Sequence, residues 1–209
     1  MGRNEEKKLQ KRTALMNSAY ELFTTTGFHK TPVLAITLKA GVSKGSFYNY
    51  FEDKEAIRDA LIIQKSGELL DEGLNALSDS GQAISPIDKF IFLINYVLDR
   101  LAEDLSLLRF ISKNLSWGLF SNAEKYQKDA TNETIDFRAF ITRMLEEDGI
   151  LPTKKIELAI FTILELINST CYNVILYGEP ASLSEYKPYL FRCVRQIFTS
   201  SLEPEGTLA

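Results

Sequence analysis

The sequence is poor in the residues on which catalytic and metal sites depend. Its 209 residues include one histidine, two cysteines and one tryptophan. The single histidine, His29, leaves no second imidazole for a metal cluster and lies apart from any nucleophile motif. No glycine-rich phosphate loop is present. We therefore expect no enzyme: no catalytic residue, no metal site and no cofactor.

Similar scarcities argue against a disulfide scaffold and a membrane protein. Cys171 and Cys193 lie on separate predicted helices, as expected in a reducing compartment. The first dozen residues are charged and lack the apolar segment of a secretory signal. The most apolar stretch, residues 159–176, contains Glu165 and two asparagines, so a buried helix fits better than a membrane span. We expect a cytoplasmic protein with no membrane partner.

Proline and glycine are few, at 6 and 11 residues, and several of them stand at the ends of helical patterns. Apolar residues repeat at helical spacing, and no segment alternates over six residues as a half-buried strand would. The fold class is therefore predicted to be all-α. About nine helices are expected, at residues 5–26, 32–40, 44–51, 54–78, 86–103, 106–119, 123–148, 154–178 and 184–202. Expected N-caps are Thr31, Ser43, Asp53, Ser85 and Thr153.

Charge is unevenly distributed along the chain. The net charge is −4, but residues 1–54 hold nine Lys and Arg against five Asp and Glu, a net +4, which leaves −8 for the rest. A small basic module beside a larger acidic one is typical of nucleic-acid binding, with random scatter of charges as the alternative.

Two short predicted helices flank the segment "LKAGVSKG", behind a longer amphipathic helix. This is the layout of a helix-turn-helix, in which the second short helix enters the DNA major groove. Gly41 suits the turn because glycine adopts positive φ without a Cβ clash. Ser43 would cap the second helix, whose N-terminus turns its positive dipole toward phosphate, and Gly45 would let the backbone approach DNA.

The aromatic residues of the second short helix divide between two faces. Phe47 and Phe51 are four residues apart and should share the core face, which turns Tyr48 outward. Tyr48 and Tyr50 can offer hydroxyls to phosphates or rings to thymine methyls, and Lys54 lies within reach of the DNA backbone. An ordinary packed helix pair with exposed tyrosines is the alternative.

Residues 31–57 closely resemble the TetR family of transcriptional regulators, whose signature is similar to T-x-x-x-x-I-A-x-x-A-G-V-S-x-G-x-x-Y-x-[YH]-F-x-x-K-x-x-[LI]. The matching residues are Thr31, Ile36, Ala40, Gly41, Val42, Ser43, Gly45, Tyr48, Tyr50, Phe51, Lys54 and Ile57. Upstream, "AYELFTTTGFHKT" is similar to the family's first helix. Thr37 departs from the usual alanine, and Leu34 stands where many relatives carry a polar residue.

The resemblance implies a DNA-binding domain at residues 1–54 and a ligand-binding and dimerisation domain at residues 55–209. The function implied is a homodimeric repressor that a hydrophobic small-molecule effector releases from a palindromic DNA operator. Activation remains open, and a helical carrier or sensor of a hydrophobic ligand without DNA binding is the alternative. The DNA-binding residues implied are Thr31, Ser43, Lys44, Gly45, Ser46, Tyr48, Asn49, Tyr50 and Lys54.

Roles within this set are only partly assigned. Thr31 and Lys54 are expected on phosphate. Asn49 could pair with adenine and Lys44 with guanine, but which side chain reads a base stays open.

Polar residues interrupt the apolar helical faces of the C-terminal domain. Aromatic stripes usually form a core, but a few polar groups converging in an apolar pocket are typical of a ligand site. We expect Asn114, Trp117, Glu165 and Tyr172 to line such a pocket. Because a carboxylate among apolar residues is costly without a partner, Glu165 should meet a cationic ligand or Arg109.

The predicted helices at residues 154–178 and 184–202 carry more apolar surface than one face can bury. Their large apolar residues include Ile156, Ile160, Ile163, Ile167, Phe191, Val194 and Phe198. We expect these two helices to form a four-helix bundle with a second subunit. The helix at residues 54–78 would then act as the lever that sets the spacing of the two recognition helices.

Overall fold

The computed structural model describes residues 3–81, 84–111, 114 and 137–203, and within them the chain forms helices and no strands. The helices are α1 (Arg3–Thr25), α2 (Val33–Lys39), α3 (Lys44–Tyr48), α4 (Lys54–Asp79), α5 (Pro86–Glu103), α6 (Leu105–Ile111), α8 (Phe137–Glu147), α9 (Lys154–Tyr177) and α10 (Leu183–Leu202). The all-α prediction is confirmed. Of the helices expected at residues 106–119 and 123–148, the parts beyond α6 and before α8 lie outside the described residues.

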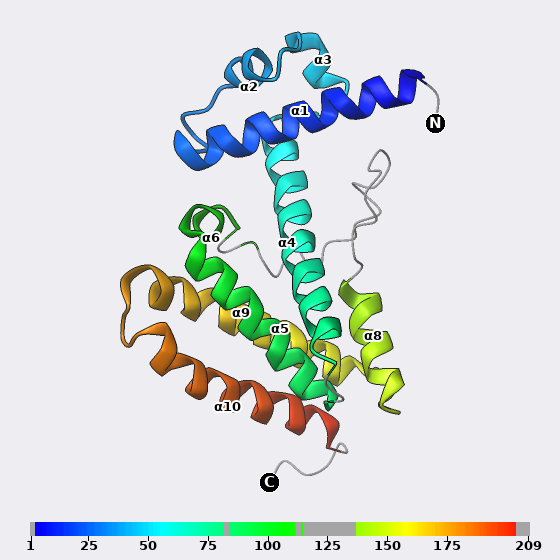
Figure 1. The fold of residues 1–209 in the computed structure, drawn as a ribbon, viewed down its shortest axis with the longest axis vertical. Helices are drawn as coiled ribbons and strands as arrows, with labels where there is room; N and C mark the ends of the chain where they lie inside the picture. The colour runs from blue at the N-terminus through cyan, green and yellow to red at the C-terminus, as the bar shows by residue number, and fades with distance from the viewer. Residues whose placement is uncertain (1–2, 82–83, 112–113, 115–136, 204–209) are drawn as a thin grey trace.

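Figure 1 shows two parts joined by the long helix α4. Helices α1, α2 and α3 lie across the upper end of α4, while α5, α6, α8, α9 and α10 surround its remaining length. We call residues 3–61 the N-terminal module and the rest of the described chain the helical bundle. The expected domain boundary at residues 54 and 55 falls at the start of α4, and the packing of the module continues past it to Leu61.

Most helix starts use the caps that the sequence indicates. Four side chains accept a hydrogen bond from the backbone N–H three residues further on: Ser43, Asp53, Ser85 and Thr153. Thr31 does not, and the expectation that it caps α2 is wrong. Helix α2 begins at Val33 after Pro32, which makes no side-chain cap. The Thr31 hydroxyl is committed elsewhere, as described below.

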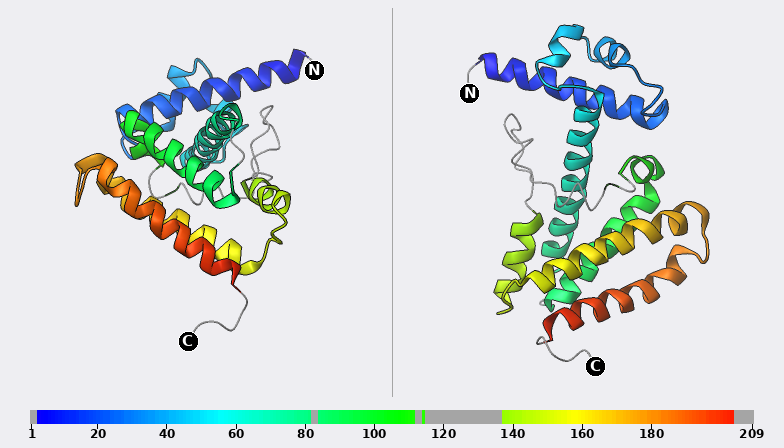
Figure 2. Two further views of the ribbon diagram at one scale, coloured as in Figure 1. Left: turned by 60° about the horizontal axis from the view of Figure 1, so that its bottom comes forward. Right: turned by 180° about the vertical axis from the view of Figure 1, so that it is seen from behind.

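The helical bundle has one large apolar core, to which α4, α5, α8, α9 and α10 all contribute. Helices α9 and α10 form its most extensive pair and run side by side in both views of Figure 2. Helix α4 crosses α5 closely at Gly73, where a Cβ atom would lie 3.2 Å from the side chain of Leu93. This crossing fixes the lower part of α4 against the bundle.

The apolar residues expected at a subunit interface belong instead to the core of a single subunit. Almost all of them are fully buried there: Ile156, Ile160, Ile163, Ile167, Val194 and Phe198. Phe191 is half-buried against the same core. The expectation was wrong because the inner faces of α9 and α10 pack on each other and on α5. The exposed apolar residues of these two helices include Leu158, Phe161 and Tyr189.

Helix α9 is, in the described part of the chain, the one helix long and apolar enough to cross a membrane by length and composition alone. Its composition has a structural explanation within the fold. The face that carries Ile163 and Ile167 fills the core of the bundle.

A second contact joins the module to the bundle, in addition to α4. The ring of Phe110 in α6 lies edge-to-face with Tyr20 of α1, at a centroid distance of 5.2 Å. It also stacks on Phe23, at 6.3 Å. The side chain of Lys65 in α4 also lies over the ring of Tyr20, with its Nζ 4.9 Å from the ring centre. Helices α1, α4 and α6 therefore meet at one aromatic contact between the two parts.

Candidate nucleic-acid interface

The N-terminal module holds its two short helices on α1 through a compact apolar core. Ile36 of α2 and Phe47 of α3 are fully buried, and Phe51 follows on the same side as Phe47. The turn between the helices closes when the Val42 N–H donates to the Thr37 carbonyl, at 3.0 Å. Gly41 adopts a φ of +67° in this turn, as predicted.

The remaining face of α3 points away from the module and is open to solvent. Lys44 and Asn49 are exposed, and Tyr48 is 52% exposed although it directly follows the buried Phe47. The split between Phe47 and Tyr48 expected from the helical spacing is confirmed. Tyr50 is half-buried against the module core, so it contributes to the exposed face only at its edge.

The start of α3 is formed by Ser43, Gly45 and Ser46. The Ser43 hydroxyl accepts from the Ser46 N–H at 3.2 Å and shares a hydrogen bond with the Ser46 hydroxyl at 3.0 Å. A Cβ atom at Gly45 would have the Ser43 hydroxyl as its nearest neighbour, at 4.0 Å. Packing inside the module therefore does not require a glycine here, which leaves room for a close approach from outside.

Thr31 lies inside the module and not on its outer face. Its side chain is 1% exposed, and its hydroxyl donates to the Gly27 carbonyl at 2.8 Å, near the end of α1. Since the buried hydroxyl already has an acceptor, we withdraw the expectation that it contacts phosphate. Its place explains why a threonine is needed just before α2.

Lys54 also has a role within the module. Its ammonium group donates to the Phe28 carbonyl at 2.9 Å and lies 4.4 Å from the centre of the Phe28 ring. The guanidinium of Arg58 lies over the same ring, at 4.8 Å. These two cations of α4 fasten the connection between α1 and α2 to the start of the lever helix. Sequence reasoning missed this contact because Phe28 and Lys54 are far apart in the chain.

Helix α2 turns two leucines to solvent beside the recognition helix. Leu34 and Leu38 are both exposed, and Leu38 was not singled out in the sequence. The buried hydroxyl of Thr37 donates to the Leu34 carbonyl at 3.0 Å, so the departure from alanine leaves no unsatisfied group.

Of the residues expected to line a ligand pocket, Glu165 is placed elsewhere by the structure. Glu165 is exposed on the outer side of α9, because the inward positions of that helix are Ile163, Leu164 and Ile167. The expectation of a buried carboxylate is therefore wrong. Tyr172 is half-buried against the apolar cluster below α6. Asn114 is half-buried, with its N–H bonded to the Ile111 carbonyl, and Trp117 lies outside the described residues.

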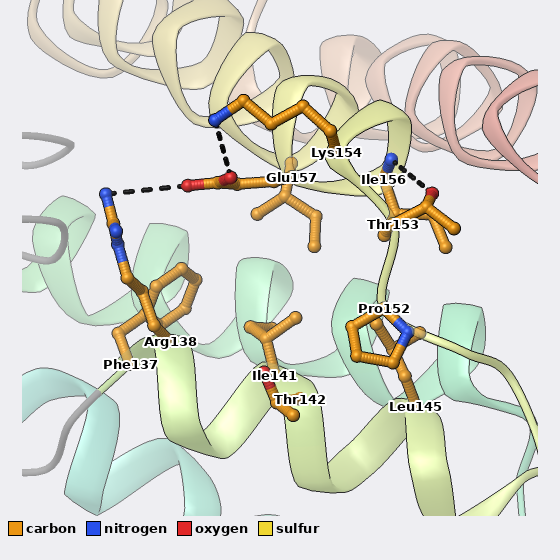
Figure 3. Close-up of a pocket in the computed structure, with 11 residues that line it drawn as sticks. Phe137, Arg138, Ile141, Thr142, Leu145, Pro152, Thr153, Lys154, Ile156 and Glu157 are labelled. Carbon is orange, nitrogen blue, oxygen red and sulfur yellow. Dashed lines mark hydrogen bonds and ion pairs between the residues drawn. The ribbon is translucent and has the colours of Figure 1, made fainter.

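The bundle contains two cavities that sequence reasoning did not find. One is a groove of about 330 Å³ between α8 and the first turns of α9, which we call the α8–α9 groove (Figure 3). Its walls are apolar apart from Thr142, Thr153 and three charged side chains. Those are Arg138, Lys154 and Glu157. The Glu157 carboxylate pairs with Lys154 at 2.7 Å and with Arg138 at 3.5 Å.

Another cavity, of about 40 Å³, lies between α4, α5, α8 and α9. We call it the Ser66 slot, after the one polar side chain among the described residues that line it. The apolar residues of its lining are Leu69, Leu70, Phe90, Leu93, Ile94, Val97, Phe137, Leu164 and Ile167. No sequence pattern could indicate this slot, since its walls come from four helices.

Burial raises the pKa of two described side chains. Burial raises the pKa of the Cys171 thiol to about 11, which keeps it protonated and unreactive at neutral pH. Burial, followed by the nearby carboxylates of Asp104 and Glu68, raises the pKa of the Tyr20 phenol. No three potential metal-ligating side chains gather among the described residues.

A glycine turn between two short helices, with the second helix packed on one face and polar on the other, defines a helix-turn-helix DNA-binding protein. The model of the bacterial regulatory proteins of the tetR family matches residues 15–61, which coincide with this module. Its match ends at Leu61, where the packing of the module also ends.

Known proteins are similar to the chain both in this module and along its length. The HTH-type transcriptional regulator YdgC of Bacillus subtilis (strain 168) is 28% identical over 187 residues, which cover 86% of this chain and 90% of that protein. The HTH-type transcriptional regulator UidR of Escherichia coli (strain K12) is 40% identical over 53 residues, or 25% of this chain and 27% of that one.

Solved structures share the whole fold at lower identity. A TetR-family regulator from Shewanella sp. PV-4 has a TM-score of 0.61 at 19% identity, covering 88% of this chain and 95% of its own. The repressor FadR of Thermus thermophilus, solved with lauroyl-CoA, has a TM-score of 0.58 at 22% identity, covering 95% and 98%. The N-terminal module is similar to the DNA-binding domain of the tetR family, and the chain is a DNA-binding transcriptional regulator.

Proposed function

We propose that the protein is a homodimeric, cytoplasmic repressor that acts by binding and not by catalysis. It would leave a palindromic operator when a small apolar effector binds. The observation that carries this proposal is the exposed polar face of α3 on a module that α4 and Phe110 tie to a cavity-bearing bundle. The relatives that match the chain are named as transcriptional regulators.

The proposed DNA surface is centred on Lys44, Tyr48 and Asn49, which α3 presents to solvent. Lys44 and Asn49 have the donors that match guanine and adenine edges, and the Tyr48 hydroxyl suits a phosphate. The backbone at Ser43, Gly45 and Ser46 would approach phosphate at the N-terminus of the helix. Tyr50 would contribute from the edge, and the net positive charge of residues 1–54 favours the polyanion.

The proposed dimer uses the outer faces of α9 and α10. Leu158 and Phe161 are exposed on α9, and Tyr189 is exposed on the adjacent α10. Large apolar side chains on the outer faces of two neighbouring helices are the kind of surface that a two-fold four-helix bundle buries. We expect an interface of more than about 1,500 Å² in total. The two copies of α3 would then read inverted half-sites about 34–36 Å apart.

A fatty acyl thioester or a related acyl compound is the effector class that we propose. The lining of the Ser66 slot and much of the α8–α9 groove is apolar, as an acyl chain requires. FadR of Thermus thermophilus was solved with lauroyl-CoA, and FadR of Bacillus subtilis, with a TM-score of 0.56 at 23% identity, with stearoyl-CoA. The fatty acid metabolism regulator protein of Bacillus subtilis is 28% identical over about half of this chain.

A salt-titrated mobility shift on genomic DNA fragments tests the DNA surface. Replacing Lys44 by alanine should weaken binding and reduce the salt slope by about one unit per subunit, because one phosphate-neutralising charge is lost. Arg143→Ala is a matched control, since this cation of α8 is exposed and lies on the bundle far from α3. Its affinity and slope should equal those of the unaltered protein.

The alternative is a helical carrier that binds a hydrophobic ligand and no DNA. The same experiment separates the two functions. Absence of any salt-dependent complex at low ionic strength, in protein that still binds lauroyl-CoA, would exclude the repressor and leave the carrier.

A further inference from the structure

We propose that the Ser66 slot is the inner end of the effector site and selects acyl chains that carry a hydroxyl or keto oxygen. The chain would enter through the α8–α9 groove and pass Phe137. This inference rests on the proposed effector control of the protein, and it assigns the residues and the chemistry of that control.

The first observation is an unsatisfied hydroxyl. Ser66 is 1% exposed, and its Oγ is the one fully buried side-chain oxygen or nitrogen of the described chain with no hydrogen-bond partner. Three other buried hydroxyls have an acceptor: Thr31 donates to Gly27, Thr37 to Leu34 and Ser201 to Phe198. A buried polar group without a partner is costly, so a group that completes it on binding gains affinity.

The second observation is that the slot is a poor site for water. Its volume of about 40 Å³ is enough for a water molecule, but a buried water generally needs two to four polar partners. Ser66 supplies the only polar side chain in the described lining. A ligand that brings one oxygen on an otherwise apolar chain matches this lining better than water does.

The slot and the groove continue one another along α9. Ile156 and Ile160 line the groove, while Leu164 and Ile167, one and two turns further on, line the slot. At 1.5 Å per residue this stretch of α9 is about 16 Å long. Phe137, the first residue of α8, lines both cavities, so their connection would pass its ring. The channel that we propose joins the two cavities at this ring.

The outer end of this channel suits an anionic head group. Arg138 and Lys154 flank Glu157 at the groove, as Figure 3 shows, so that two cations face one carboxylate there. The lining becomes wholly apolar beyond them, except for Ser66. Apart from Thr142 and Thr153 in the groove, the channel therefore offers charged groups, then hydrocarbon, then the single hydroxyl of Ser66, which is the pattern of an oxygenated acyl chain.

An occupant of the slot would press directly on the lever helix. Ser66, Leu69 and Leu70 all belong to α4, the helix whose first turns pack in the N-terminal module. Gly73, one turn further, holds α4 against α5. A chain that fills the slot above this crossing would push α4 away from α5 and so tilt the module.

Direct binding of matched fatty acids to the purified full chain tests the proposal. Dodecanoic acid and its hydroxy isomers, with the hydroxyl moved stepwise along the chain, would be titrated by calorimetry. We expect one isomer to bind about tenfold more tightly than dodecanoic acid, from one added hydrogen bond. Ser66→Ala should bind both acids equally and, without ligand, should unfold at the same or a higher temperature.

Ser201→Ala is the matched control, because Ser201 is equally a buried serine but its hydroxyl already donates to Phe198 at 2.6 Å. It should keep the preference for the hydroxy acid. Phe137→Leu, which replaces this ring by a smaller side chain, should speed association of every acid in stopped-flow measurements. This second variant tests the route independently of Ser66.

The proposal is overturned if no oxygenated acid is preferred, or if Ser66→Ala keeps the preference. Unchanged association rates in Phe137→Leu would overturn the route. Operator binding measured in parallel without ligand separates these outcomes from the proposed function. If the unaltered protein fails to bind operator, the proposed repressor function is wrong. If the unaltered protein and Ser66→Ala show the same ligand preference, only the assignment of Ser66 is wrong.

Discussion

The N-terminal module and the helical bundle are both built from amphipathic helices, but they differ in the hydrogen bonding of their buried hydroxyls and in the polarity of their exposed faces. The module buries Phe47, Ile36 and Thr31, none of its described side-chain polar atoms is both fully buried and unpartnered, and its open face is polar. The bundle leaves a hydroxyl unpartnered inside and apolar rings exposed outside. This difference indicates that the module is a self-contained folded unit. The bundle, in contrast, has an inner and an outer surface that suit further binding partners.

The outer faces of α9 and α10 provide the strongest test of that contrast. Phe161→Asp would place a charge on the exposed apolar face while leaving the core of the subunit intact. We expect a folded monomer, and operator affinity lower by at least about a hundredfold, because the linked second half-site contact is lost. Light scattering and mobility shift measure both effects.

Val194→Asp is the comparison variant on the neighbouring helix. Val194 is fully buried within the subunit, so its replacement should produce unfolded or insoluble protein and not a soluble monomer. A Phe161→Asp protein that stays dimeric at micromolar concentration would show that this face of α9 is not the interface.

Two adjacent aromatic residues of α3 separate folding from DNA binding. Tyr48→Ala removes an exposed ring and should lower operator affinity by about tenfold at an unchanged melting temperature. Phe47→Ala empties the module core and should cost about 3–5 kcal/mol of stability. Tyr48→Ala should therefore change the mobility shift but not the thermal denaturation, whereas Phe47→Ala should lower the melting temperature. Normal operator binding by Tyr48→Ala would move the DNA surface away from this face.

The sequence predicted the module well because its geometry is local. Gly41, Ser43 and the spacing of Phe47 from Phe51 determine the turn, the cap and the buried face within a few residues of one another. The one error in this region, at Thr31, and the missed contact of Lys54 both involve distant partners. Thr31 bonds back to the end of α1, and Lys54 to Phe28, and neither contact leaves a periodic signal in the sequence.

The bundle was predicted only as far as its helices. Periodicity indicates that α9 has an apolar side, but not whether a neighbouring helix or a second subunit covers it. Ile163 was therefore assigned to the wrong partner, and Glu165 to the wrong side of the helix. The cavities could not be predicted, because Ser66 is a common residue in a helix and its missing partner depends on four helices meeting.

Lys54 tests how firmly the module is fastened to the lever. Lys54→Met keeps the length of the side chain but removes the hydrogen bond to Phe28 and the charge over its ring. We expect a loss of about 1–2 kcal/mol in stability. Operator affinity should fall modestly with an unchanged salt slope, in contrast to Lys44→Ala. A slope reduced by about one unit would instead return Lys54 to the phosphate contacts.

Phe110 provides the subtlest test, because it addresses the coupling between the two parts and neither part alone. Its ring packs on Tyr20 and Phe23 of α1, a contact that would transmit movement of α6 to the module without a covalent connection. Phe110→Ala should leave operator affinity without effector nearly unchanged but reduce the coupling between effector and operator by about 0.5–2 kcal/mol. Phe140→Ala is the control, since that half-buried ring of α8 packs on the bundle core. Operator release measured against effector concentration distinguishes the two variants. Equal release by Phe110→Ala, Phe140→Ala and the unaltered protein would mean that α4 alone carries the signal.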